Sequence, residues 1–345
     1  MNSTGSDMLA VRASARAVFE DFYARGWTDG LPIIPPTDVE VRAMLGGTTL
    51  SQDAVVAHIP PSEAPATVEK LAINAVMAGC RPEYLPVLIA AVQAATEKQV
   101  ELLSVQATTH PCAPLVIVNG PVRQRIQMNC KGNAFGQGWM ANATIGRAMR
   151  FVLVNIGGGV PGPVDRCTLG QPSKYTFCVG ENEEDSPWEP LHVERGYPKD
   201  TDVVTVTVSE NPHNINDHAS ATAADLLKTI AGSMTGAGTN DTRHGRGKPV
   251  VVIGPEHAAM LAREGMSKHD VKQALFEGSK LDLRWMSLPN MASERRPRPD
   301  QADQRVPLVE SPDDIVLIVL GGPGRHSAFL PSFGHNGIAS RRVES

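Results

Sequence analysis

A chain of 345 residues with a net charge of −5 excludes a strongly basic protein that binds nucleic acid through a positive surface. Hydrophobic residues make up 41% and charged residues 20%, as in an ordinary globular protein. No run approaches the ~20 apolar residues that span a bilayer, so we expect no membrane partner.

The first residues and the cysteines indicate the compartment. Residues 1–8 are polar and lack the apolar core of a signal peptide. The five cysteines are widely spaced and form no Cys-x-x-Cys pair, which argues against disulfides and a structural zinc site. We therefore expect a protein of the reducing cytoplasm.

Apolar spacing predicts the elements of the first two hundred residues. A Pro-rich strap, Trp27–Pro36, ends the first predicted helix. The predicted elements are helices over 9–25, 37–45, 66–80, 82–97 and 142–156, and strands over 54–59, 115–118 and 175–179.

From residue 202 strands alternate regularly with helices. The predicted elements are strands over 203–208, 250–253 and 315–320, and helices over 219–234, 256–264 and 268–277. This alternation predicts an α/β fold with mostly parallel or mixed sheets covered by helices. Length predicts two domains. We place them at 1–200, an α/β domain with a Gly/Asn-rich loop and an acidic segment, and at 201–345, a Rossmann-like α/β domain.

The first candidate site is the glycine-rich loop after the last predicted strand. Ligands of parallel sheets bind beyond the carboxyl ends of strands, and glycines let backbone N–H groups approach an anion. An arginine in the loop can grip a carboxylate or phosphate. The alternative is a tight turn with solvated side chains. The candidate anion-binding residues are Gly322, Gly324, Arg325, His326 and Ser327.

A second candidate is the Gly/Asn-rich stretch 129–138 before the helix predicted over 142–156. Asn142 is a suitable N-cap, and a helix N-terminus attracts anions. Asn133 in the loop and Arg147 one turn into the helix would add contacts to the anion. The alternative is a plain capped helix that packs closely through Gly146.

The third candidate is the acidic segment Glu181–His192, with five carboxylates and one histidine. Glu181 and Glu183 could divide acid and base roles, with His192 orienting a reacting group. A mixture of carboxylate and imidazole also suits a divalent metal, with Glu181, Glu184 and His192 as ligands. No other cofactor is predicted. The alternative is a solvated acidic loop.

The fourth candidate lies before the strand predicted over 115–118. His110 and Cys112 are two residues apart, so both point the same way in an extended segment. The pair could make a thiolate nucleophile, or His110 alone could move a proton. The alternative is a buried thiol beside an unrelated histidine.

Two familiar nucleotide or hydrolase motifs are not supported. Gly157–Gly162 matches Gly-x-Gly-x-x-Gly but follows a predicted helix rather than a strand, which argues against nicotinamide binding. The chain also lacks a Gly-x-Ser-x-Gly elbow, which argues against an α/β-hydrolase triad.

Several strings spread over most of the chain resemble a largely uncharacterised bacterial family associated with UGSC-motif proteins, in which U is selenocysteine or cysteine. The resemblance implies a two-component enzyme whose reactive thiol lies on a UGSC-type partner subunit. This chain has no Cys-Gly-Ser-Cys of its own. The strings are Trp27–Pro32, Asn74–Tyr84, Asn142–Arg147, Gly170–Tyr175, Ser186–His192 and Gly321–Ser327.

Together these features predict an oligomeric enzyme, or the substrate-holding subunit of one, that acts on a small anionic molecule. The expected chemistry is cleavage or hydration of a carbon–heteroatom bond, by a lyase or hydrolase. A non-catalytic scaffold subunit is the main alternative, and a thiol redox protein is a further one. The candidate loops form one active site only if the fold brings them together with His110 and the acidic segment.

Overall fold

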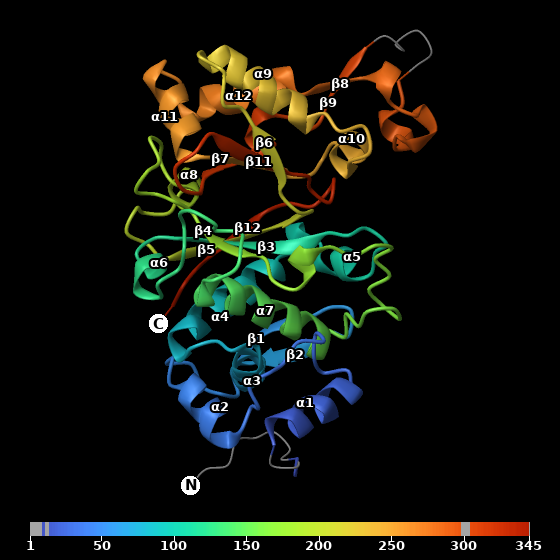
Figure 1. The fold of residues 1–345 in the computed structure, drawn as a ribbon. Coiled ribbons are helices and arrows are strands. Elements are labelled where there is room, and N and C mark those ends of the chain that lie inside the picture. Colours follow the sequence, from blue (N-terminus) through green and yellow to red (C-terminus); the bar gives the residue numbers. More distant parts are fainter. Residues whose placement is uncertain (1–8, 11–13, 298–303, 345) are drawn as a thin grey trace.

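The computed structural model describes residues 9–10, 14–297 and 304–344 (Figure 1). Residues 1–8, and residues 11–13 of the first predicted helix, lie outside the described residues. The helix begins after Ser14, whose hydroxyl accepts a hydrogen bond from the backbone N–H of Ala17.

The described helices are short, and none combines the length and apolarity needed to cross a bilayer. The α-helices are α1 (Ala15–Ala24), α2 (Asp38–Leu45), α3 (Val68–Ala78), α4 (Leu85–Ala95), α5 (Leu102–Gln106), α6 (Val122–Arg125), α7 (Met140–Asn155), α8 (Leu191–Glu194), α9 (Ala223–Met234), α10 (Asn240–His244), α11 (Pro255–Arg263) and α12 (Lys268–Gly278).

Two four-stranded sheets form the centre of the described part of the chain, and two small hairpins lie outside them. The first sheet has the order β12 (Ala339–Arg342), β5 (Val203–Ser209), β3 (Ala113–Asn119), β4 (Cys178–Gly180). The second has the order β10 (Val316–Val319), β7 (Val250–Ile253), β11 (His326–Leu330), β6 (His213–Asn216). The hairpins are β1 (Val55–Ile59) with β2 (Ala64–Thr67), and β8 (Lys280–Asp282) with β9 (Arg305–Pro307).

The α/β class is confirmed, and both sheets are mixed rather than mostly parallel. In the first sheet only β3 and β4 run parallel, and in the second only β7 and β10 do. Two predicted strands, β3 and β5, pair antiparallel, and β11 and β12, which the sequence pattern does not predict, add antiparallel neighbours to β7 and β5.

The two sheets stack face to face, and alternate residues of each central strand point to opposite sides. In β3, Leu115 and Ile117 pack between the sheets, whereas Val116 and Val118 pack toward the helices. The same alternation in β7 sends Val252 between the sheets and Val251 outward. A strand covered on both faces is apolar at every position, which explains its continuous hydrophobic run.

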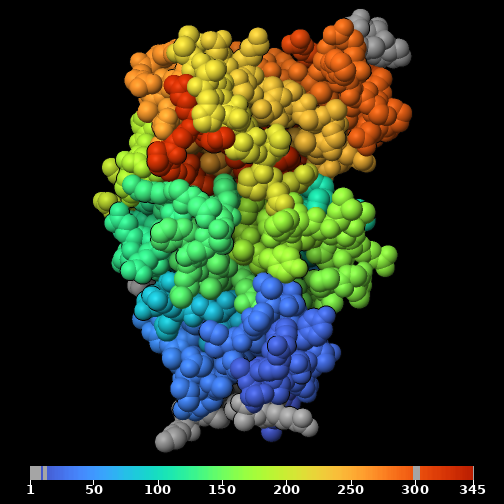
Figure 2. Space-filling model, in the orientation of Figure 1, coloured from blue at the N-terminus to red at the C-terminus, as the bar shows by residue number. Residues whose placement is uncertain are grey.

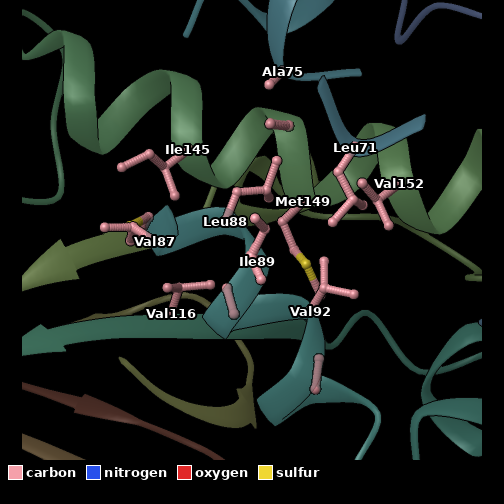
Figure 3. Packing of buried hydrophobic residues seen from close by; sticks show 14 of the residues in the cluster. Leu71, Ala75, Val87, Leu88, Ile89, Val92, Val116, Ile145, Met149 and Val152 are labelled. Atoms are coloured by element: carbon pink, nitrogen blue, oxygen red, sulfur yellow. The ribbon is translucent and has the colours of Figure 1, made fainter. Parts of the chain in front are cut away.

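Helices cover the outer face of each sheet and complete a four-layer α/β/β/α arrangement (Figure 1). On the first sheet, side chains of α3, α4 and α7 meet above Val116, among them Leu71, Leu88 and Met149 (Figure 3). Helix α4 is buried along nearly its whole length, as expected for a helix that is apolar all round.

On the second sheet, α9, α11 and α12 form the other outer layer. The space-filling view places the N-terminal elements and these helices at opposite ends of the molecule (Figure 2). The first sheet lies between them, so each end of the molecule is built on one of the two sheets.

The predicted boundary near residue 200 does not coincide with the division between the sheets. The first sheet takes β3 and β4 from before residue 200 and β5 and β12 from after it. Strand β5 pairs along its full length with β3. The predicted boundary and the division between the sheets differ because the pattern of strands and helices along the sequence gives their order. It does not show which strands pair.

Candidate functional site

Three of the predicted loops meet at the carboxyl ends of β3, β4 and β10. Backbone N–H of Gly321 donates to the carbonyl of Cys130 over 3.1 Å. The side-chain amide of Asn182 donates to the carbonyl of Gly321, also over 3.1 Å. A Cβ at Gly322 would lie 2.9 Å from the Cα of Gly132, so these two loops touch through backbone alone.

The carboxylates at this edge bind the protein itself. Glu181 is 1% exposed and accepts hydrogen bonds from Asn119 Nδ2 (2.7 Å) and Leu191 N (2.8 Å). Burial raises the pKa of Glu181. Glu183 accepts a hydrogen bond from Gly120 N over 2.8 Å and pairs with Arg123 at 3.0 Å. These contacts fix the loop after β4 against the end of β3, and they occupy both carboxylates.

The predicted metal ligands do not converge. Glu184 turns outward to pair with Arg123 at 3.1 Å. His192 is fully buried, with Nε2 3.0 Å from the carbonyl of Lys199 and Nδ1 4.0 Å from Glu183 Oε1. Among the described residues, no group of three or more His, Cys, Asp and Glu side chains could hold an ion. The structure does not bring Glu181, Glu184 and His192 together, because residues close in sequence leave β4 in different directions.

The glycine-rich loop after β10 is stabilised by contacts within the protein rather than open to an anion. Arg325 donates from Nη1 to the carbonyls of His218 (3.0 Å) and Ser220 (3.1 Å). The N–H of Gly324 donates to Glu256 Oε1 over 2.6 Å. The guanidinium and amide predicted to bind an anion therefore organise neighbouring loops.

The last two residues of that loop, His326 and Ser327, each contact a histidine from another segment. Ser327 is buried, and its Oγ lies 2.8 Å from His257 Nδ1. His326 is exposed and contacts His218 through the Nε2 atoms at 3.2 Å. Both side chains thus interact on the second sheet, whereas the start of the same loop, at Gly321, contacts Asn182 of the acidic segment.

The Gly/Asn-rich stretch is held by asparagine side chains. Asn142 lies inside α7, whose N-cap position is Trp139, so the predicted N-cap is three residues too late. Its amide exchanges two hydrogen bonds with the backbone of Asn129, at 2.9 and 2.8 Å. Asn133, at φ +63°, donates to the carbonyl of Gln137. Both side chains shape the loop.

Arg147 binds the Pro-rich strap instead of a ligand. Its guanidinium makes a bidentate pair with Asp29, at 2.7 and 2.8 Å, and donates to the carbonyls of Leu31 and Pro32. This pair ties residues 27–36 to α7, which is the structural alternative to anion binding.

His110 lies at the opposite end of the first sheet, before the amino end of β3. Its Nε2 is 2.7 Å from Glu210 Oε1, and its Nδ1 is buried with no hydrogen-bond partner among the described residues. Cys112 is 1% exposed, and burial raises the pKa of its thiol to about 12, which disfavours a nucleophile there. The structure therefore brings three of the four predicted constellations together at one end of the first sheet and leaves His110 and Cys112 at the other.

A groove of about 910 Å³ lies at this amino end. Its walls are Gly26, Thr28 and Asp29 at the start of the strap, the last turns of α7 and the segment 161–175 that leads into β4. The groove segment 161–175 also touches the His110 region, because Thr168 N donates to the carbonyl of Thr109 over 3.0 Å. His110 and Cys112 therefore flank the groove without lining it.

The groove lining contains more basic side chains than its acidic side chains can neutralise. The two acids of its lining, Asp29 and Asp165, are paired with Arg147 (2.7 Å) and Lys174 (2.6 Å). Arg150, one turn beyond Arg147, makes one hydrogen bond, from Nε to the carbonyl of Lys174 (2.8 Å).

Within the described part of the chain Arg150 has no carboxylate within 4.0 Å, and burial lowers its pKa. Arg166, which also lines the groove, is exposed. An anion would satisfy the Arg150 guanidinium.

A thiol also lines the groove. Cys167 is partly exposed, and its Sγ accepts a hydrogen bond from the N–H of Gly170 over 3.1 Å. Sequence reasoning missed this groove, although Arg150 follows Arg147 by three residues and helical spacing places the two on one face. The sequence of the segment 161–175 indicates only turns.

Comparison of the chain with protein-family models, with curated proteins and with solved structures finds no match. The resemblance to UGSC-associated proteins, the partner subunit and the oligomeric state therefore stay predictions.

Proposed function

We propose that this protein is an enzyme, or the substrate-holding subunit of one, that binds a small anionic molecule in the groove beside Arg150. The observation that carries the proposal is the Arg150 guanidinium, which lines the groove with one hydrogen bond and no ion pair among the described residues. A partly desolvated cation without a counterion is costly, and a carboxylate or phosphate would provide two charge-assisted hydrogen bonds.

The size and charge of the groove support a small ligand. Its volume of about 910 Å³ falls within the range of small-molecule sites. Because Asp29 and Asp165 are neutralised by Arg147 and Lys174, Arg150 and Arg166 set the sign of the local charge. The position at the amino end of β3 departs from the carboxyl-end site expected for parallel sheets, as mixed sheets allow.

The proposed chemistry is cleavage or hydration of a carbon–heteroatom bond, by a lyase or hydrolase. Such steps need a positioned group that moves a proton. His110, held by Glu210 at 2.7 Å, is the candidate beside the groove. Glu181, Glu183 and His192 belong to the network at the other end of the first sheet and are not part of this proposal.

Binding is tested by titrating the purified chain with small dicarboxylates and phosphate esters, using calorimetry and the shift in melting temperature. We expect saturable binding that Arg150→Met weakens by roughly 10- to 100-fold, since a charged hydrogen bond contributes about 1.5–3 kcal/mol. Arg166→Gln is the matched control at the exposed rim, with a change below about fivefold. Unchanged binding in Arg150→Met, or no saturable anion in the panel, would overturn the proposal.

Catalysis is tested separately, with a ligand found in that panel. His110→Gln should leave the dissociation constant unchanged and lower turnover by about 100-fold or more. Turnover that is absent from the wild-type chain, alone and with added cell extract, would instead favour a non-catalytic binding subunit.

A further inference from the structure

Two histidines from distant parts of the chain meet on the surface of the second sheet. His218 follows the end of β6, and His326 is the first residue of β11. Their Nε2 atoms are 3.2 Å apart, and the rings are nearly perpendicular at 82°. Both residues are exposed, so an ion could reach the pair from solvent.

The backbone on both sides of the pair is held in place. His326 is paired in register with Asn216 across the β11–β6 ladder. On the other side, Arg325 donates to the carbonyls of His218 and Ser220. The two imidazoles therefore start close together, which lowers the cost of bringing both onto one ligand.

A second set of contacts holds the turn after β6. Asp217 accepts hydrogen bonds from the N–H of Ser220 (2.9 Å) and from its hydroxyl (2.7 Å). The carbonyl of Asp217 lies 3.0 Å from Nε2 of the buried His257. The carboxylate of Asp217 is thus engaged with Ser220, and the turn presents the His218 imidazole to solvent beside that of His326.

The spacing of the two Nε2 atoms fits a transition-metal ion. Metal–nitrogen bonds of ~2.0–2.1 Å at a tetrahedral angle place two ligand atoms about 3.3 Å apart. Imidazole nitrogens favour Zn²⁺, Ni²⁺ and Cu²⁺, whereas Mg²⁺ and Ca²⁺ require oxygen ligands. The nearby Arg325 cation also opposes ions that bind through charge alone.

We propose that His218 and His326 chelate one transition-metal ion, with Zn²⁺ and Ni²⁺ as the simplest probes. Because two side chains supply the ligands, the remaining coordination positions stay open to water or to an anionic ligand. The site lies on the second sheet and is independent of the groove beside Arg150.

Calorimetric titration of the untagged chain with ZnCl₂ and NiCl₂ tests the proposal. We expect one ion per chain, and His218→Asn and His326→Asn should each weaken binding by about 10-fold or more, since even outer partners of metal ligands contribute 10- to 100-fold. His269→Asn, at an exposed histidine of α12, is the matched control and should bind as wild type.

The free cysteines are the competing ligands, so the titration is repeated after alkylation of accessible thiols. Absorption of the Co²⁺ form gives a second readout, since nitrogen ligation lacks the intense charge-transfer bands of thiolate. Binding that persists in both histidine variants, or that alkylation abolishes, would overturn the assignment, as would failure of the wild-type chain to bind either metal.

Discussion

Arg147 and Arg150 leave α7 one turn apart, and only Arg147 meets a carboxylate among the described residues, that of Asp29 at 2.7 Å. One arginine is therefore part of the structure, and the other lines a groove with its charge unpaired in the described part of the chain. We therefore expect substitution of Arg147 to lower stability, and substitution of Arg150 to weaken ligand binding with little effect on stability.

Replacing each arginine by methionine separates the two roles. Arg147→Met should lower the free energy of unfolding by about 3 kcal/mol, because it leaves the partly buried Asp29 carboxylate without its partner. Arg150→Met removes a desolvated charge and one hydrogen bond, so we expect a change within about 1 kcal/mol. Urea unfolding at pH 7 measures both, and equal losses would contradict the assignment.

Asp241 should make stability depend on pH in an unusual direction. It is fully buried in α10 and accepts hydrogen bonds from the backbone N–H and hydroxyl of Ser332. Burial raises the pKa of Asp241 to about 6, from an ordinary value of 3.8. The folded state therefore takes up this proton more readily than the unfolded chain does, and the contribution of Asp241 to stability falls as pH rises from about 4 to 6.

The variant Asp241→Asn isolates this effect, since it keeps the shape of the side chain without its charge. Above pH 6 the variant should be more stable than wild type, by on the order of 3 kcal/mol for a shift of two pKa units. The advantage should disappear near pH 4. Parallel urea titrations at pH 4 and pH 8 give the comparison, and an advantage that is the same at both would show that Asp241 does not titrate this way.

Apolar strands could be predicted from the sequence, and polar strands could not. The expected strands over 203–208, 250–253 and 315–320 correspond to β5, β7 and β10 within one residue at each end. Strand β12 carries Ser340, Arg341 and Arg342, and its strand conformation comes from pairing with β5. Pairing with residues more than a hundred positions away overrides local propensity.

From the sequence we could predict the type of side chain at the candidate site, but not which residue provides it. The sequence favours an arginine site for an anion, and it points to Arg325 and Arg147 because both accompany glycine-rich loops. The structure gives Arg147 a partner in Asp29, 118 positions away, and leaves Arg150 without a carboxylate among the described residues. Sequence patterns give the types of side chain, whereas the pairing of charges depends on which distant segments touch.

The loops that contain Gly132 and Gly322 are so close that we expect no room for a side chain at residue 322. A Cβ at Gly322 would lie 2.9 Å from the Cα and 3.0 Å from the N of Gly132, both backbone atoms. Gly322→Ala should therefore cost about 1–3 kcal/mol of stability, as overpacking does. Gly232 is the matched control, because it lies inside α9 and a methyl group there would meet no described atom of another segment within 4 Å.

Gly232→Ala should instead add up to about 1 kcal/mol, because alanine favours a helix. Thermal unfolding of the two variants shows the opposite signs. A neutral Gly322→Ala would mean that the loops separate without cost.

Cutting the chain at residue 200 should leave an N-terminal piece that does not fold alone. The cut removes β5 and β12 from the first sheet, and separates β3 from its seven-residue antiparallel partner. We expect fragment 1–200 to lack cooperative unfolding by circular dichroism, whereas fragment 201–345 keeps all four strands of the second sheet. Co-expression of both fragments should restore cooperative unfolding of 1–200, and a cooperative transition in 1–200 alone would show an independent domain.

The place of β12 at the edge of the first sheet has a consequence for synthesis of the protein. A ribosome releases residues 339–342 after all the other strands of both sheets, so β5 stays without its outer neighbour until that moment. An unpaired, apolar strand is a template for pairing with another nascent chain. The edge of β5 is therefore open to such pairing until β12 docks, and a stop codon before residue 339 would leave it open indefinitely.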